Sequence, residues 1–416
     1  MNIRSGEIRP ATTSKKETRI KQGIYQETHT SIQNIGLMAV LGHKGRARRA
    51  TYDVFKTHNS KLFGLMKSGL YHLPLQVLNA LAEEFDFDGA FNEPIQRYRK
   101  RKPQGGCREI CVPGTYLMAT HHLIGAVIDA QTVHSNNVYS RKGQGRNALI
   151  QDALRRVNDG HCYVSTLDIE NCFASVNPVV LDRLPVHQRF VSHSLRNENL
   201  IFATPLIKYG KEVCNQSKDE NIFSPLYRED MNNTGAPTGL MQGSPASWPI
   251  LGWVWKDLPP IDENVGFVHV YVDDILVVAK SEAGRREITD AVVQFLQDCP
   301  AGPLGLTQID YNVGQAFEFL GYEISYDCGD GLADARLAEA AFSKLERVLP
   351  QLVEVDRLRG SEFPYSACAK LRAILGGHSM ASDLDEWWDY YVETLLDYDL
   401  TSESPFDLRY TATLAS

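Results

Sequence analysis

The chain has no long apolar run, no CxxC cysteine pair and no excess of positive charge, and each absence excludes a class of protein. No stretch of roughly 18 or more apolar residues occurs, so we expect no membrane-spanning helix. The first residues, MNIRSGEIRPATTSKKETR, lack the apolar core of a secretory signal. The 8 cysteines form no CxxC pair. We therefore expect reduced thiols in a cytoplasmic protein.

The net charge of −8 argues against a nucleic-acid-binding protein, but this charge is unevenly distributed. Residues 1–150 carry a net charge of +11, whereas residues 151–416 carry −19. Phosphate binding needs a positive surface rather than a positive total, so the first third of the chain can bind nucleic acid. Two solvated faces of opposite sign would give the same totals. The densest cationic clusters are Arg97–Lys102 and the group Lys44, Arg46, Arg48 and Arg49.

The order of expected helices and strands indicates an α+β protein with three regions. Residues 1–95 are predicted to form a helical N-terminal extension. Its first 35 residues are polar, a composition that is compatible with partial disorder. Residues 96–325 mix strands and helices, and residues 326–416 are predicted to be mostly helical. Arg97–Lys102 and Arg108–Val112 are expected to pair as a hairpin across a Pro-Gln-Gly-Gly turn.

Acidic residues stand at the ends of two apolar strands. Residues 265–279 contain the arms FVHVYV and ILVVA, separated only by Asp273-Asp274, which predicts a hairpin with a two-residue turn. A second strand, Cys162–Leu167, leads into Asp168. Other expected elements are helices at 115–131 and 282–296 and a strand at 317–325.

Two adjacent carboxylates at a hairpin tip repel each other unless a cation neutralises them. Mg²⁺ prefers oxygen ligands and often combines a few carboxylates with substrate phosphates. Two such ions about 4 Å apart can activate a 3′-hydroxyl and stabilise a leaving pyrophosphate. Asp168, Asp273 and Asp274 suit this arrangement, although an Asp-Asp turn is also a common structural feature.

Six segments resemble those of reverse transcriptases and occur in the same order. Tyr271-Val272-Asp273-Asp274 resembles the YxDD box, and Leu167–Val176 resembles the first carboxylate motif. Met241–Pro245 resembles the Gln-Gly-x-Pro segment between them. The remaining segments resemble two fingers motifs and the primer-grip hairpin, and these are Arg108–Pro113, Arg141–Arg146 and Phe319–Tyr322.

The resemblance implies a right-hand fold, with fingers and palm at 96–325 and a helical thumb at 326–416. It implies an RNA-directed DNA polymerase that uses dNTPs and two Mg²⁺ ions, for which Mn²⁺ could substitute. Its catalytic residues would be Asp168, Asp273 and Asp274. The metal ligands implied are these three residues and Ile169. Its partners would be an RNA template and a DNA product, with no membrane involved.

The resemblance also assigns contacts to substrates. Phe173, five residues after Asp168, takes the position of an aromatic ring that blocks a ribose 2′-hydroxyl; it could equally be a core residue. The residues expected to contact the nucleotide are Lys102, Arg108, Phe173, Gln242 and Gly243. The structural alternative for Lys102 and Arg108 is a solvated basic loop. The structural alternative for Gln242 and Gly243 is a Gly-Pro turn. The residues expected to contact nucleic acid are Arg97, Arg99, Lys100, Arg101, Arg141, Lys142, Arg146, Leu320 and Gly321.

In its size and in the modules that it lacks, the chain most resembles compact bacterial reverse transcriptases of anti-phage defence. Those enzymes commonly work with a structured noncoding RNA. Many relatives place a Lys before the primer-grip motif, but residues 306–316 contain none, so no proton donor for pyrophosphate is predicted. Two alternatives remain open: a protein-primed or template-independent DNA polymerase, and a non-catalytic RNA-binding scaffold.

Overall fold

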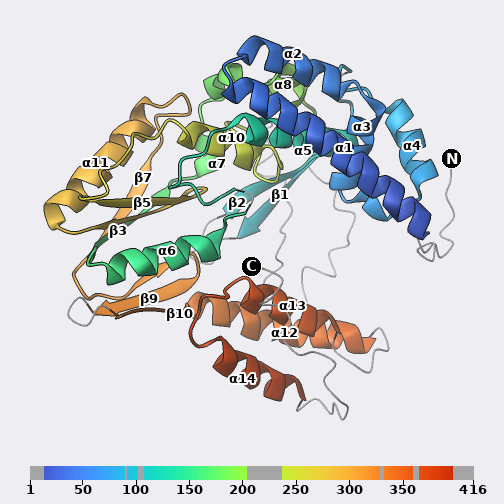
Figure 1. The fold of residues 1–416 in the computed structure, drawn as a ribbon. Coiled ribbons are helices and arrows are strands. Elements are labelled where there is room, and N and C mark those ends of the chain that lie inside the picture. Colours follow the sequence, from blue (N-terminus) through green and yellow to red (C-terminus); the bar gives the residue numbers. More distant parts are fainter. Residues whose placement is uncertain are drawn as a thin grey trace.

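Helices and strands follow one another without a repeating unit in the computed structural model (Figure 1). This confirms the predicted α+β class. The structure describes residues 14–89, 91–101, 107–141, 143–203, 237–327, 332–358 and 365–396.

The described part of the N-terminal region is helical from Lys15 onward. The helices here are α1 (Lys15–Val40), α2 (Lys44–Phe55), α3 (His58–Lys67) and α4 (Leu75–Glu84), with a 3-10 turn at Leu70–His72. The hydroxyl of Ser14 caps α1 by accepting a hydrogen bond from the Glu17 amide at 3.2 Å. Ile32 and Ile35 are buried. Residues 15–35, part of the stretch where the polar composition suggested partial disorder, are thus helical, because one apolar stripe anchors an otherwise polar helix.

The predicted basic hairpin is present. Strands β1 (Ile95–Arg101) and β2 (Cys107–Val112) pair antiparallel, with Arg97 opposite Cys111. The short strand β4 (Phe202–Ala203) adds to β1 in parallel. The turn at 102–106, which includes Lys102, lies outside the described residues.

A four-stranded antiparallel sheet forms the centre of the molecule, in the order β5-β6-β3-β7. Its strands are β3 (Tyr163–Ile169), β5 (Gly266–Tyr271), β6 (Asp274–Ala279) and β7 (Leu306–Tyr311). Along β6, Ile275, Val277 and Ala279 belong to one hydrophobic core, and Leu276 and Val278 belong to another. Successive side chains point to opposite faces, so a strand covered on both sides is apolar throughout.

Helices cover the two faces of this sheet (Figure 1). Helix α11 (Glu282–Asp298) packs on one face and α6 (Arg146–Asn158) on the other. Helix α5 (Thr115–Gln131) has the predicted bounds, and it packs against α10 (Ser247–Trp255) and α1. The contact with α1 is close: a Cβ on Gly36 would lie 2.1 Å from the Ala130 carbonyl oxygen.

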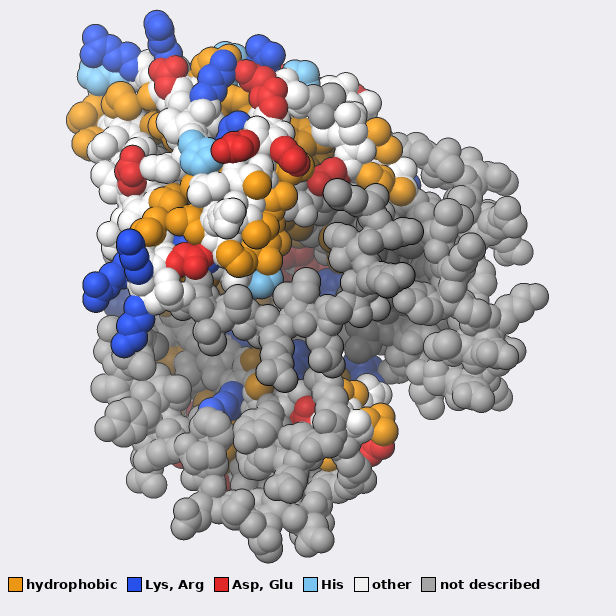
Figure 2. Space-filling model, turned by 90° about the vertical axis from the view of Figure 1, so that its right-hand side faces the viewer, with side chains coloured by type: hydrophobic (Ala, Val, Ile, Leu, Met, Phe, Trp, Pro, Cys, Tyr) orange, Lys and Arg blue, Asp and Glu red, His pale blue; other side chains and the backbone are white. Residues whose placement is uncertain are grey.

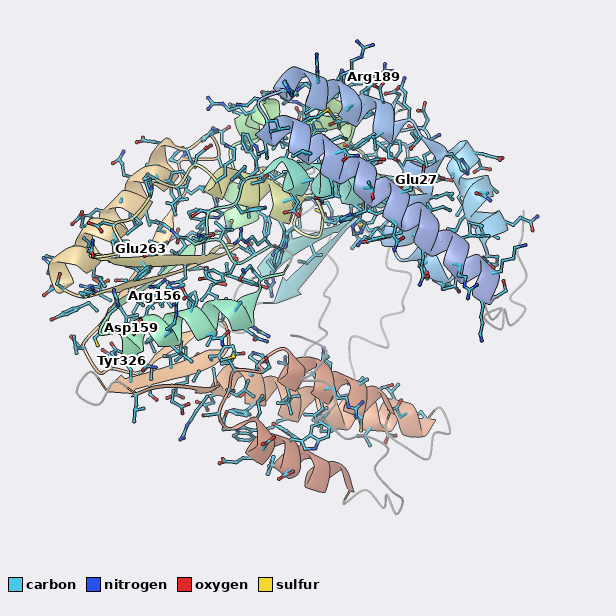
Figure 3. The ribbon with its side chains drawn as sticks, in the orientation of Figure 1. Glu27, Arg156, Asp159, Arg189, Glu263 and Tyr326 are labelled. Carbon is cyan, nitrogen blue, oxygen red and sulfur yellow. The ribbon has the colours of Figure 1, made fainter. Side chains whose placement is uncertain are left out.

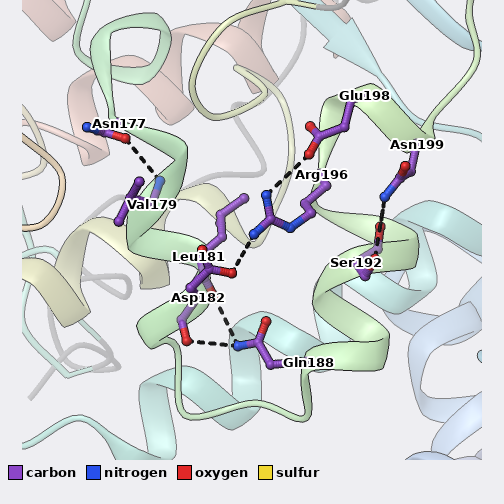
Figure 4. Close-up of polar contacts among 9 residues, drawn as sticks. All are labelled: Asn177, Val179, Leu181, Asp182, Gln188, Ser192, Arg196, Glu198 and Asn199. Carbon is purple, nitrogen blue, oxygen red and sulfur yellow. Dashed lines mark hydrogen bonds and ion pairs between the residues drawn. The ribbon is translucent and has the colours of Figure 1, made fainter.

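Short helices fill the chain between β3 and β4. They are α7 (Cys172–Ser175), η2 (Pro178–Arg183), α8 (Gln188–Ser194) and η3 (Asn197–Asn199). Figure 4 shows the polar contacts that hold them together. The Arg196 guanidinium joins Asp182 to Glu198, and Gln188 Nε2 donates to the Asp182 carbonyl at 3.0 Å. These side-chain bonds stabilise a connection that has little regular secondary structure.

The C-terminal region contains more strand than predicted. The expected single strand at 317–325 is a hairpin, and the first residues of the expected helical region form a third strand. The elements are β8 (Phe317–Phe319), β9 (Tyr322–Asp327), β10 (Leu332–Leu337), α12 (Glu339–Leu358), α13 (Tyr365–Gly376) and α14 (Leu384–Leu396). Leu320 and Gly321, both at positive φ, turn the hairpin.

The β8-β9-β10 sheet is joined to the central sheet beside α6. The Tyr326 hydroxyl donates to the Cys162 carbonyl oxygen at 2.9 Å. Figure 3 shows Tyr326 below Arg156 and Asp159, at the C-terminal end of α6. The Arg156 guanidinium lies 3.5 Å from the Phe267 ring centroid, a cation–π contact that ties α6 to β5.

One cysteine differs from the expectation of reduced thiols. Cys162 is disulfide-bonded, whereas Cys111, Cys172, Cys299 and Cys368 are free. Spacing along the sequence could not show this bond, because folding rather than sequence proximity brings such a pair together. Among the described residues, no helix is both long and apolar enough to cross a membrane.

Candidate active site

The turn of the acidic hairpin lies one residue earlier than predicted. Tyr271 pairs with Asp274, so Val272 and Asp273 form the turn and Asp274 begins β6. Val272 has φ of 62°, an unfavourable value for a β-branched residue. The Trp255 indole N–H donates to the Val272 carbonyl oxygen at 3.1 Å. This buried tryptophan holds the turn in a conformation that local preference would not select.

The shift places Asp274 directly opposite Asp168. These two residues are register partners in the β3–β6 ladder, and paired residues on antiparallel strands point to the same face. The Ile169 amide donates to the Asp273 carbonyl oxygen at 3.2 Å, which brings the turn to the end of β3. Directly opposed side chains have Cβ atoms about 5 Å apart, and like charges there are destabilising.

The electrostatics of the hairpin reflect this crowding. Burial, reinforced by Asp273 and Asp168, raises the pKa of Asp274 to about 7. Burial also raises the pKa of Asp273, whereas the Arg108 guanidinium opposes that rise. The pKa of the buried Cys172 thiol is raised by burial and by all three carboxylates. The three Asp side chains therefore interact as one acidic cluster.

A cavity of about 460 Å³ lies beside this cluster. Its lining joins residues from β2, β3, α7 and the 237–242 segment with Asp273 of the hairpin turn, and it includes six predicted site residues. These six are Arg108, Asp168, Ile169, Phe173, Gln242 and Asp273. Phe173 is half-buried against the core, and Arg108 is exposed. Residues predicted from four of the six segments that resemble reverse transcriptases therefore line one cavity.

Close backbone approaches hold the Gln242 segment between β2 and α7. Gly243 has φ of 114°, and a Cβ there would lie 2.2 Å from the Cys111 carbonyl oxygen. The Cys111 amide donates to the Gln242 carbonyl oxygen at 2.7 Å. At the other end, the Leu240 amide donates to the Phe173 carbonyl oxygen at 2.6 Å. Only glycine fits at position 243 without displacing β2.

His121 supports this segment through two hydrogen bonds, and this role was not predicted from the sequence. Its Nε2 lies 2.7 Å from the Ser194 carbonyl oxygen, and its Nδ1 lies 2.9 Å from Ser244 Oγ. Because the carbonyl can only accept, Nε2 carries the proton and Nδ1 accepts from the Ser244 hydroxyl. Complete burial lowers the pKa of His121 to about 4. A neutral imidazole thus fixes the residue that follows Gly243.

The predicted nucleic-acid contacts have varied surroundings. Arg97 forms an ion pair with Glu109, with Nη2 and Oε2 2.6 Å apart. The Arg146 guanidinium donates to the carbonyl oxygens of Leu320 and Gly377, so it joins the β8–β9 turn to the end of α13. Arg141 lines a second cavity, beside Tyr271. Lys142 lies outside the described residues, as do the side chains at positions 99–101.

The expected metal site at the carboxylates depends on the donor atoms that these residues offer. Within the described ranges, no three His, Cys, Asp or Glu side chains are gathered as one metal-ligating group. Ile169 has a hydrocarbon side chain, which is buried in the core, so its main-chain carbonyl oxygen is the atom that could bind a metal ion. The donor set nevertheless matches what Mg²⁺ prefers, since it consists of carboxylate and carbonyl oxygens.

No protein-family model and no curated protein matches the chain. Similar solved structures include telomerase from Candida albicans in complex with a TWJ fragment of telomeric RNA, at 10% identity and a TM-score of 0.35, covering 77% of this chain and 59% of that chain. The corresponding Candida tropicalis complex has 13% identity and a TM-score of 0.38, with 82% and 61% covered.

The RNA-dependent RNA polymerase of BmCPV at quiescent state has 11% identity and a TM-score of 0.39, with 74% of this chain and 27% of that chain covered. The chain therefore spans less than two thirds of the length of each of these three proteins. Likenesses of this size do not decide what this chain does.

Proposed function

We propose that this chain is an RNA-directed DNA polymerase whose catalytic residues are Asp168, Asp273 and Asp274. The observation that carries the proposal is the direct pairing of Asp168 with Asp274, next to a cavity that Asp168, Asp273, Phe173 and Gln242 line. Opposed carboxylates at a strand pair are unfavourable by themselves, and a divalent cation would relieve their repulsion.

The proposed cofactor is Mg²⁺, as two ions, with Mn²⁺ as a substitute. Asp168, Asp273 and Asp274 would hold the ions, with the Ile169 carbonyl as a further oxygen ligand. When bound, such ions lower the pKa of a 3′-hydroxyl and stabilise the charge on the leaving pyrophosphate.

The residues around the carboxylates have separate roles in this proposal. Arg108 brings positive charge to the same cavity and opposes the rise that burial causes in the pKa of Asp273, so it suits the triphosphate. The half-buried Phe173 ring would pack against the sugar and exclude a 2′-hydroxyl. Gln242 and Gly243 would contact the nucleotide from a segment that β2 and His121 hold in place. In this reading β1–β2 belongs to the fingers, the central sheet to the palm and α12–α14 to the thumb.

The proposed partners are an RNA template, dNTPs and a structured noncoding RNA, in a role in anti-phage defence. The resemblance of the six segments supports the RNA template and the dNTPs, and the resemblance to compact bacterial reverse transcriptases of anti-phage defence supports the noncoding RNA and the defence role. Purifying the protein with its nucleic acid and sequencing that material tests it, because a single enriched structured RNA is expected. Recovery of only random cellular RNA would remove the noncoding partner from the proposal.

The test of the polymerase itself is dNTP incorporation on a primed RNA template with Mg²⁺. Asp273→Ala with Asp274→Ala should reduce synthesis at least a thousandfold, on the order expected when the electrostatic core of a site is lost. The matched control is Glu287→Ala with Asp290→Ala, two exposed carboxylates on α11 that should leave activity unchanged. Synthesis by the first variant at the native rate would overturn the assignment.

A further inference from the structure

An exposed apolar patch lies beside cationic residues where α1 ends. Leu37, Val40 and Leu41 have exposed fractions of 58%, 59% and 64%. Residues three and four apart lie on the same side of a helix, so these side chains are neighbours. A contiguous exposed patch of this kind marks an interaction site more often than a single exposed residue does. We name as the N-terminal corner Leu37, Val40, Leu41, Lys44, Arg46 and Arg49.

The fold holds this corner open to solvent. Ile35 and Gly36 face inward, and the close approach of Gly36 to Ala130 fixes the rotation of α1. On α2, Ala47 is buried, whereas Lys44, Arg46 and Arg49 are exposed and make no ion pair with any described residue. Arg48 is omitted because it donates to the Leu184 carbonyl oxygen at 3.2 Å. Lys and Arg side chains gather beside hydrophobic ones at the top of Figure 2.

The composition of the corner favours a protein partner over RNA. Cations alone suffice for binding phosphates. Three exposed aliphatic side chains add nothing to such a contact, but they form the apolar centre that a protein interface needs. The cations around them then require an acidic rim on the partner.

Helix α14 carries a complementary surface. Asp385, Glu386, Asp389 and Tyr390 recur at one- and four-residue spacings, so they share one side of the helix. All four are exposed, with Tyr390 at 51%, and the three carboxylates make no ion pair within the described part of the chain. We call these four residues the acidic face. The tyrosine ring supplies apolar area at low entropic cost.

We propose that the N-terminal corner of one copy of this chain binds the acidic face of α14 on a second copy. Helices α2 and α14 lie at opposite ends of the molecule (Figure 1), so one chain cannot satisfy both surfaces by itself. The contact is head-to-tail and leaves the pair with one free surface of each kind. Such a heterologous contact closes into a ring or continues as a filament. This inference is independent of the proposed polymerase activity.

The test is the molar mass of nuclease-treated full-length protein, measured by light scattering at low and at high salt. Oligomers are expected at low salt, and they should dissociate as salt screens the charge pairs. Arg46→Glu with Arg49→Glu should weaken association roughly tenfold or more, and so should Asp385→Lys with Asp389→Lys, because like charges would then face each other. Mixing the two variants restores opposite charges at every contact, so the mixture should associate again.

Lys15→Glu with Arg19→Glu is the matched control, since it reverses two exposed charges at the far end of α1 and should leave the mass unchanged. The proposal fails if the native protein stays monomeric at low salt, or if the mixture of the two variants does not associate. It also fails if the corner variant loses affinity for RNA while its self-association is unchanged, which would assign the corner to nucleic acid.

Discussion

Asp168 and Asp274 are register partners on neighbouring antiparallel strands, with both carboxylates on one face of the central sheet. Sheets avoid like charges at this position because the side chains are about 5 Å apart. Here burial adds to the repulsion, and the pKa of Asp274 is raised to about 7. The pair therefore lowers the stability of the ion-free protein at neutral and alkaline pH.

Replacing Asp274 by Asn should stabilise the ion-free protein. Because the folded-state pKa is raised from its ordinary value to about 7, the folded protein holds a proton that the unfolded chain releases between about pH 4 and 7. The contribution of Asp274 to native stability should therefore fall as pH rises through this window. Asp274→Asn should remove that slope and add about 1–3 kcal/mol at pH 8. Thermal unfolding with chelator across this range measures both.

The same experiment with Mg²⁺ tests the ion. Mg²⁺ should raise the native melting temperature, since a ligand that binds only the folded state stabilises it. Mg²⁺ should raise the melting temperature of Asp274→Asn by a smaller amount. Equal Mg²⁺ shifts in the two proteins would mean that the carboxylates are not the binding site.

Phe173→Ala should change which sugar the enzyme accepts. The half-buried ring lines the cavity beside Asp168, so its removal would admit a 2′-hydroxyl without disturbing the carboxylates. The ratio of kcat/KM for rNTP to that for dNTP should rise by tenfold or more, or about 1.4 kcal/mol of lost discrimination. Phe173→Tyr keeps the ring and should keep the native ratio. An unchanged ratio for Phe173→Ala would reduce this residue to a packing role.

Gly243→Ala should destabilise the protein. The added Cβ would lie 2.2 Å from the Cys111 carbonyl oxygen, and φ of 114° is unfavourable for alanine. We expect a loss of about 2–4 kcal/mol in the free energy of unfolding, together with lower activity. Gly23→Ala is the control, because that position on α1 has no heavy atom within 4 Å of the added Cβ. It should be neutral or gain up to about 1 kcal/mol. Urea unfolding distinguishes the two, and equal effects would contradict the proposed crowding.

His121→Phe should leave the Ser194 carbonyl and the Ser244 hydroxyl without their buried partner, at a cost of about 2–4 kcal/mol. The contribution of His121 to native stability should also be lost as pH falls from about 6.5 to 4, because only the unfolded chain takes up this proton in that range. Comparing the pH dependence of unfolding for the two proteins isolates this histidine. If both proteins lost stability equally as pH falls, protonation of His121 would not be what limits stability in acid.

The sequence predicted best those elements that one local pattern determines. Helix α5 has its predicted bounds because Gly114 and Thr132 flank an uninterrupted apolar helix. The acidic turn was misplaced by one residue, since Asp favours turns and Val does not. A distant side chain, Trp255, overrides that preference through its bond to the Val272 carbonyl. Tertiary contacts of this kind leave no trace in the spacing of residues.

The same reason explains which site residues were missed. The sequence could suggest Asp168, Phe173, Gln242 and Asp273 because each stands in a recognisable segment. His121 stands in an apolar helix, and 123 residues separate it from Ser244. Its role became visible only when its two ring nitrogens could be assigned to named partners. A buried histidine with both nitrogens satisfied carries no sequence pattern of its own.

The order of strands in the central sheet also constrains when a working molecule exists. Strand β3 is made early but pairs only with β6 and β7, and 145 residues separate Ser165 from its partner Asp310. Such long-range pairing is slow, and it cannot begin on the ribosome until the later strands have emerged. Until then, Asp168 stands on an unpaired strand. A nascent or truncated chain that ends before β6 therefore contains the cationic N-terminal region without the opposed carboxylates.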